Sequence, residues 1–284
     1  MGLWKVPMAH NRLRAFSLLA ALILAGVPHA WAHGGMDRAP NGLPGEFYIG
    51  QTTTTGFDTR FRAAGLERDL RQVLVRVSGD PSLARDKRVM GLVPDMMALI
   101  RLYSYQDEMA GIPRHDEQGT RDRPYRLTVQ FYPEKIDALL ARLGDKPWLE
   151  PRPTIVPVVL VEGGDAPKTT TYLVTREGPE ASDARLDLAR FALRYGVAIE
   201  VPSAAQLKAW GVATNAFPVV PSRDGQVMAG GTVRFRVVTL GWVGIWRMQV
   251  GNDIRVWSVG GVEMADALDS LIAGAVAEAS GHAE

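Results

Sequence analysis

The chain has 284 residues, of which 46% are hydrophobic and 22% are charged, as in an average globular domain, which excludes a disordered or fibrous protein. Its 32 Lys and Arg residues nearly balance its 31 Asp and Glu residues, so the basic excess typical of nucleic-acid-binding proteins is missing and we expect no nucleic-acid partner. Cysteine does not occur, which excludes disulfides, cysteine-ligated zinc, iron–sulfur clusters and thiol catalysis.

Residues 1–32 have the three parts of a secretory signal peptide. A basic start precedes an apolar run over residues 16–27, and Ala30-Trp31-Ala32 then provides a small-x-small cleavage site. The apolar run is shorter than the roughly 20 residues that a membrane-spanning helix needs. We therefore expect cleavage after Ala32, export by the general secretion route to the periplasm, and no stable membrane anchor afterwards.

The next segment, residues 33–46, is rich in Gly and Pro and is predicted to be a flexible linker. Residues 47–146 then mix helical and alternating patterns, which predicts an N-terminal α+β domain. The elements expected in it are a short strand at 47–51, a helix at 59–78, a helical stretch at 85–102 broken near Pro94, a loop at 107–123, a strand at 125–132 and a helix from Pro133 to Gly144.

Four prolines between residues 147 and 157 mark a boundary, and a second domain is predicted over residues 154–280. Its continuous apolar run at 155–161 is typical of a strand that is buried on both faces. The other elements expected are strands at 170–174, 197–201, 233–240, 242–250 and 254–259, helices at 181–195 and 264–278, and a short helix whose capping box is Ser203 and Gln206. The fold class predicted for the whole chain is α+β, with two small domains. The second is a layered α/β unit that ends in an antiparallel hairpin and a C-terminal helix.

The sequence contains none of the common catalytic motifs for nucleophilic serine, nucleotide or zinc-protease chemistry. Beyond the predicted leader there are three histidines: His33, His115 and His282. Only His115, in the long loop, is expected to be held in place, and the adjacent residues His115, Asp116 and Glu117 rarely converge on one ion. We therefore expect no metal and no cofactor.

Two acidic residues, Glu162 and Asp165, follow the predicted buried strand, where α/β proteins often place functional sites. Two carboxylates can act as an acid–base pair, but a Gly-rich turn explains the same residues more simply. We expect that the pair is not catalytic and that the protein is not an enzyme.

A cluster of aromatic residues lies in the predicted C-terminal strands. Trp242 and Trp246 share one face of a strand because they are four residues apart, Trp257 lies on the next strand, and Arg247 is adjacent. Exposed indoles could bind a sugar ring or a partner protein. Buried indoles would instead pack beneath the C-terminal helix, which we favour because leaving them in water forfeits a large apolar area.

Four parts of the chain carry a family resemblance: QVLVRVSGD at residues 72–80, Tyr-Ser-Tyr at 103–105, YRLTVQFYPEKIDALL at 125–140, and the Gly-Trp pair at 241–242 with its later tryptophans. In this order they resemble the exported proteobacterial proteins grouped as domain of unknown function 2066, over most of residues 47–280. The second half is also remotely similar to small α/β domains of periplasmic assembly factors, such as the outer-membrane lipoprotein activators of peptidoglycan synthases and the curli secretion protein. The resemblance implies no catalytic residues.

These observations favour a non-enzymatic periplasmic protein that binds other cell-envelope components in an interaction or assembly role. The alternative is a periplasmic ligand- or glycan-binding module that uses Trp242, Trp246, Trp257 and Arg247. An enzyme that uses Glu162 and Asp165 is the third interpretation.

Overall fold

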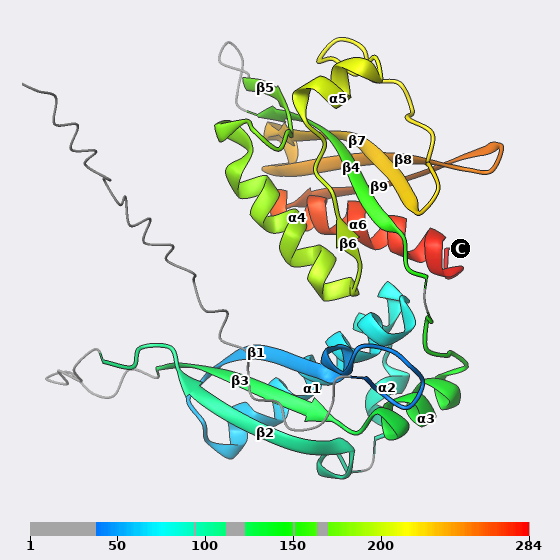
Figure 1. Cartoon of the computed structure of the whole chain (residues 1–284). Coiled ribbons are helices and arrows are strands. Elements are labelled where there is room, and N and C mark those ends of the chain that lie inside the picture. The colour runs from blue at the N-terminus through cyan, green and yellow to red at the C-terminus, as the bar shows by residue number, and fades with distance from the viewer. Residues whose placement is uncertain (1–37, 94, 112–122, 150, 164–169, 284) are drawn as a thin grey trace, which may run out of the picture. The chain divides into compact units, whose positions relative to one another are not determined.

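The computed structural model describes residues 38–283 except 94, 112–122, 150 and 164–169 (Figure 1). These described residues belong to one compact unit and form an α+β fold with two sheets. The predicted signal peptide at 1–32 and the residues immediately after it lie outside the described part of the chain. Within the part described, every helix is too short or too polar to cross a membrane.

The first sheet has three antiparallel strands in the order β1-β3-β2, with β1 at Ile49–Thr55, β2 at Ile100–Asp107 and β3 at Pro124–Phe131. The central strand β3 buries the alternate side chains of Leu127, Val129 and Phe131, as its apolar–polar alternation predicts. These side chains share a core with the long helix α1 (Thr59–Ser78) and with α3 (Pro133–Leu143). The predicted bounds of both helices are confirmed.

The predicted helical stretch at 85–102 is wrong for most of its length. Short helical turns occupy Pro81–Ala84, Arg88–Gly91 (α2) and Met97–Leu99, and β2 begins at Ile100. Residues 100–102 continue into the alternating Tyr103-Ser104-Tyr105, whose pairing with β3 outweighs the helical spacing of the residues before them.

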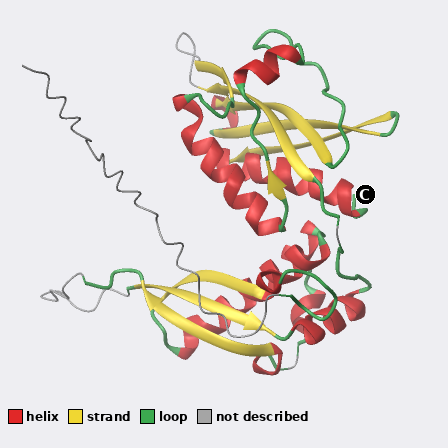
Figure 2. Ribbon diagram, viewed as in Figure 1, coloured by secondary structure: helices red, strands yellow, loops and turns green. Residues whose placement is uncertain are grey.

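The second sheet has six strands (Figure 2), five of which follow the order β5-β4-β7-β8-β9, while β6 pairs with β4. The strands are β4 at Thr154–Gly163, β5 at Thr170–Leu173, β6 at Ala198–Ile199, β7 at Gln226–Arg236, β8 at Gly241–Val250 and β9 at Asp253–Val262. Strand β4 pairs in parallel with β7, and β7, β8 and β9 form an antiparallel meander. The predicted C-terminal hairpin is confirmed, with a tight turn at Gly251 and Asn252.

Helices cover the two faces of this sheet unequally. One face packs against α4 (Ser182–Tyr195) and α6 (Met264–Ser280), and α6 contacts β7, β8 and β9. Among the described residues, the other face is covered mainly over β4 and β7, where Val158 and Met228 pack against Leu207 of α5 (Ala204–Ala209) and the segment that follows α5. The predicted capping box of Ser203 and Gln206 starts α5.

The segment between the two sheets is held by Arg152. Its guanidinium donates hydrogen bonds to the carbonyl oxygens of Arg76 (2.8 Å) and Val77 (3.0 Å) at the end of α1, and to those of Tyr195 (3.2 Å) and Gly196 (3.3 Å) at the end of α4. Helix C-termini carry partial negative charge, so one cation stabilises both helix ends. Residues from both predicted domains therefore share a single hydrophobic core.

The predicted flexible linker differs from the structure over residues 38–46. Ala39 and Leu43 are buried with 5% and 1% of their surface exposed, and the backbone of Ala39 donates to the carbonyl of Leu43. The side chain of Asn41 donates to Asp137 of α3 over 2.9 Å. Gly and Pro in this segment form a tight turn rather than a mobile tether, since the turn buries two apolar side chains.

A single buried carboxyl group lies between α1 and the first sheet. Asp69 of α1 is fully buried against Gly50 of β1, and neither of its carboxylate oxygens has a hydrogen-bond partner among the described residues. Burial raises the pKa of Asp69 to about 8, although Arg68 and Arg76 oppose the shift. The folded protein thus retains a proton that the unfolded chain releases near pH 4.

We predict that Asp69→Asn removes a pH dependence of stability. The folded-state pKa is raised, so the stabilising proton is fully present below about pH 4 and is lost as pH rises towards 8. Relative to the variant, the unfolding free energy of the wild type should fall by up to about 1.4 kcal/mol per pH unit in this window. Urea unfolding at several pH values measures it, with exposed Asp183→Asn as the control. Parallel wild-type and Asp69→Asn profiles would contradict the prediction.

Candidate functional site

The predicted tryptophan face is packed beneath α6, as expected for the buried alternative. Trp246 is fully buried, and its indole nitrogen donates to the hydroxyl of Ser270 over 2.8 Å. Trp257, directly opposite on β9, donates to the backbone carbonyl of Ser270 over 2.9 Å. Trp242 is half-buried at the other end of the strand, with its ring 5.6 Å from that of Phe235. The fully buried ring of Trp246 offers no surface to a sugar.

Arg247 lies on the opposite face of the sheet from Trp246, because successive side chains of a strand alternate. Its guanidinium donates to the carbonyl of Phe217 over 2.7 Å and lies 5.8 Å from the centre of that ring. The small pocket here, lined by Val158, Phe217 and Arg247 among others, holds no more than about one water molecule. The structure therefore does not bring the four predicted site residues together.

The predicted acid–base pair is described only in part. Glu162 forms an ion pair with Arg234 on the neighbouring strand β7. Asp165 lies outside the described residues, as do His115, Asp116 and Glu117. A carboxylate paired with an arginine is the arrangement expected for a strand-stabilising contact.

An open strand edge with apolar side chains is the clearest candidate for a docking surface in the described part of the chain. Within the described residues, strand β9 ends the second sheet and pairs only with β8. On the face away from α6, Ile254 and Val256 of β9 are 56% and 65% exposed, and Ile245 of β8 is 53% exposed. We call these three residues and the free side of β9 the β9 edge.

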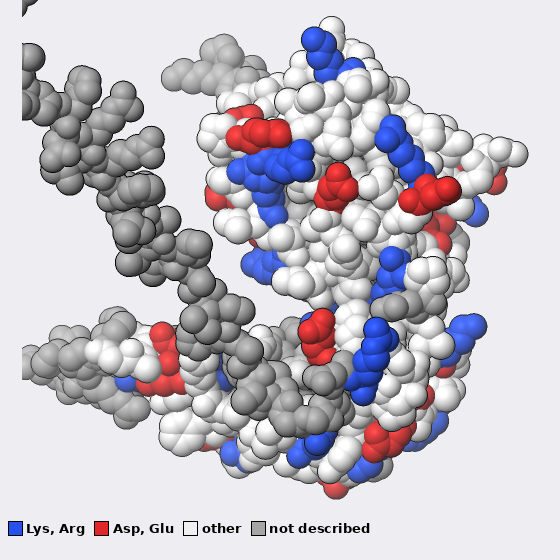
Figure 3. Space-filling model, in the orientation of Figure 1, with Lys and Arg blue, Asp and Glu red and all other residues white. Residues whose placement is uncertain are grey.

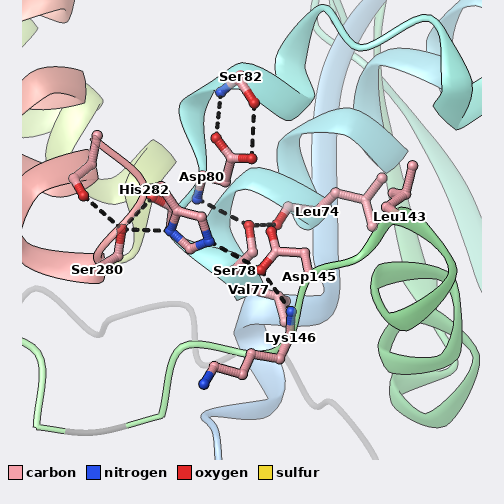
Figure 4. Close-up of polar contacts among 12 residues, drawn as sticks. Leu74, Val77, Ser78, Asp80, Ser82, Leu143, Asp145, Lys146, Ser280 and His282 are labelled. Atoms are coloured by element: carbon pink, nitrogen blue, oxygen red, sulfur yellow. Dashed lines mark hydrogen bonds and ion pairs between the residues drawn. The ribbon is translucent and has the colours of Figure 1, made fainter. Parts of the chain in front are cut away.

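A second constellation lies where three helices end, and we call it the helix-end cluster (Figure 4). Helix α1 is followed by Gly79-Asp80, α3 by Gly144-Asp145 and α6 by Gly281-His282. Each glycine has a positive φ, at 77°, 88° and 82°, which is the left-handed conformation that commonly terminates a helix. The same turn thus places three side chains with metal-ligand chemistry within 4.8 Å of one another.

Hydrogen bonds orient each member of the helix-end cluster. The carboxylate of Asp80 accepts bonds from the backbone and the hydroxyl of Ser82, both over 2.8 Å. Asp145 accepts the amide of Lys146 through Oδ1, which also lies 3.1 Å from Nε2 of His282. The other ring nitrogen, Nδ1, lies 2.9 Å from the hydroxyl of Ser280.

The expectation that only His115 is held in place overlooked His282. Its position near the end of the chain suggested a loose residue, yet Gly281 turns it back and the His282 amide bonds to the carbonyl of Ala277. The available signal was a repeated pattern, in which each of three helices is followed by glycine and then by Asp or His. Periodicity within helices does not show which helix ends meet in space.

Comparison with known proteins identifies an uncharacterised domain in the first half. The family model described as Domain of unknown function (DUF8605) matches residues 45–149, which include β1–β3, α1–α3, Asp80 and Asp145, but not His282. No curated protein and no solved structure matches the chain.

We predict that Trp246→Ala lowers the unfolding free energy by about 3–5 kcal/mol, because it removes a fully buried indole and leaves a cavity beneath α6. The neighbouring Ile245→Ala, on the exposed face, is the matched control and should change it by less than about 1 kcal/mol. Urea denaturation followed by far-ultraviolet circular dichroism measures both. A greater loss of stability for Ile245→Ala than for Trp246→Ala would mean that the faces of β8 are assigned the wrong way round.

Proposed function

We propose that this chain is a non-enzymatic periplasmic protein that binds a cell-envelope protein by accepting a strand at the β9 edge. The observation that carries the proposal is the outer side of β9, which is ten residues long and pairs with no other strand of the described chain. It lies beside the exposed side chains of Ile245, Ile254 and Val256. In this proposal, the partner protein binds by pairing one of its own strands with the β9 edge.

Free strand edges attract other strands, so soluble proteins usually protect them with Pro, Lys, a bulge or a covering segment. Strand β9, with the sequence DIRVWSVGGV, contains neither Pro nor Lys, and its register is regular from Asp253 to Gly260, with one irregularity at Gly261 near its end. Its one cation, Arg255, points towards α6, where it lies 3.7 Å from Glu278. The edge therefore has little of the usual protection.

The chemistry of the β9 edge indicates what it would accept. An added strand gains main-chain hydrogen bonds from the edge, and its alternate side chains meet the sheet face beside it. Ile254 and Val256 favour a segment with alternating apolar residues. On the face of the molecule that Figure 3 shows, acidic and basic side chains are interspersed. The described part of this face therefore has no large patch of one charge that would attract a partner electrostatically.

The glycan-binding alternative receives less support. It requires exposed indoles next to Arg247, whereas Trp246 is buried and Arg247 lies on the other face, bonded to Phe217. Periplasmic location is supported by the signal-peptide pattern of residues 1–32.

The docking proposal predicts site-specific crosslinking in cells. A photoreactive phenylalanine analogue at position 254 or 256 should give a discrete adduct with an envelope protein, and Ile254→Lys combined with the probe at 256 should abolish it. Val238, which is 97% exposed in the turn before β8, is the matched control site and should give no such adduct. Equal adducts at all three sites, or none, would refute the proposal. An adduct with a second copy of the chain would replace the envelope partner by self-association.

Export makes a separate prediction. N-terminal sequencing of the protein purified from the periplasmic fraction should begin at His33, because signal peptidase cleaves after a small-x-small site such as Ala30-Trp31-Ala32. Material that retains Met1, or that is confined to the cytoplasm, would refute the periplasmic assignment without affecting the strand-docking test in purified protein.

A further inference from the structure

We propose that the helix-end cluster of Asp80, Asp145 and His282 is a binding site for one divalent cation of the zinc class. Two carboxylates and one imidazole match the oxygen and nitrogen ligands that Zn²⁺ takes in proteins, and a fourth position would remain for water. This site is independent of the β9 edge, and its test does not depend on the docking proposal.

The electrostatics of the cluster call for a cation. Among the described residues, neither Asp80 nor Asp145 is within ion-pair distance of a Lys or Arg side chain. His282 alone, even when protonated, carries one positive charge against two negative ones.

The hydroxyl proton of Ser280 determines which nitrogen of His282 is available. Ser280 Oγ lies 2.9 Å from the carbonyl oxygen of Gly79, and two oxygens that close need a proton between them, which only the serine can supply. Ser280 therefore accepts a hydrogen bond from Nδ1–H of His282. In the neutral ring this leaves Nε2 with a lone pair that faces Asp145 Oδ1 at 3.1 Å.

Either a ring proton or a metal cation can lie between Nε2 and Oδ1 at this distance, and the spacing suits zinc. Zinc–ligand bonds of about 2.0–2.1 Å in a tetrahedron separate neighbouring ligand atoms by about 3.3 Å, close to the distance observed. A histidine ligand that donates its second N–H to a neighbouring oxygen is also the usual arrangement around bound zinc. Ser280 is thus a positioning residue.

An unpartnered buried oxygen is the second, independent observation. The Asp145 side chain is only 10% exposed, and its Oδ2 atom is buried with no hydrogen-bond partner among the described residues. Leaving a charged oxygen unsatisfied in this way is costly, and a cation bound to the Asp145 carboxylate would reduce that cost by neutralising its charge. The cation would join residues that are 137 positions apart in the chain.

The test is a calorimetric titration of the purified chain lacking residues 1–32, after dialysis against a chelator. Zn²⁺ should bind with a stoichiometry of one and raise the thermal unfolding midpoint, while Mg²⁺, which prefers all-oxygen octahedral sites, should not bind measurably. His282→Gln and Asp145→Asn should each abolish the stoichiometric binding and the shift in midpoint. Ser280→Ala should weaken Zn²⁺ affinity about 10- to 100-fold, the usual effect of removing an outer-shell partner.

The matched control is Asp183→Asn, an exposed carboxylate at the start of α4, which should bind Zn²⁺ as the wild type does. Co²⁺ bound in place of Zn²⁺ gives a visible spectrum that reports the number of ligands. If a variant folds poorly, this spectrum of the wild type tests the site instead. No saturable binding of Zn²⁺ to the wild type would overturn the proposal and leave a protonated His282 paired with Asp145. Binding that survives both His282→Gln and Asp145→Asn would overturn it equally.

Discussion

The guanidinium of Arg152 is the interaction on which the joining of the two sheets depends. It lies in the proline-rich connection and bonds to four backbone carbonyls at the ends of α1 and α4, while its flat faces contact the rings of Phe47 and Trp148 at 4.6 and 4.5 Å. Arginine suits this position because its fork of donors is planar and always charged, whereas lysine could satisfy fewer carbonyls. One side chain thereby converts a linker into part of the core.

Much of the fold could be predicted from residue patterns because local rules and tertiary packing agree there. Helix α1 has an apolar stripe and a terminal glycine, β4 is apolar throughout, and Ser203 with Gln206 start α5. The prediction failed at 85–102, where helical spacing competes with pairing to β3, and at β6, which is reduced to Ala198 and Ile199. Strand length depends on partners that the sequence alone does not display.

The candidate sites divide in the same way. The burial of Trp246 followed from the need of α6 for a sheet face, because the alternating side chains of β8 leave only two choices. The helix-end cluster could not be found from spacing, since its three members are single residues that follow three different helices. What they share is the preceding glycine, and Gly79 is doubly constrained. It has a positive φ, and a Cβ there would lie 2.5 Å from Trp148 and 2.9 Å from Ser280.

The contacts of α6 have a consequence for the order in which the chain can fold. His282 follows Asp145 by 137 residues, so a chain that emerges from its N-terminus, at the ribosome or at a translocation channel, presents the ends of α1 and α3 well before α6. Throughout that interval the ends of α1 and α3 lack the helix that closes them, and Trp246 emerges before Ser270 can cover it. Until α6 is available, the apolar sheet face that it covers, including Trp246, stays exposed. A holding chaperone could therefore bind this face up to the moment at which α6 packs on it.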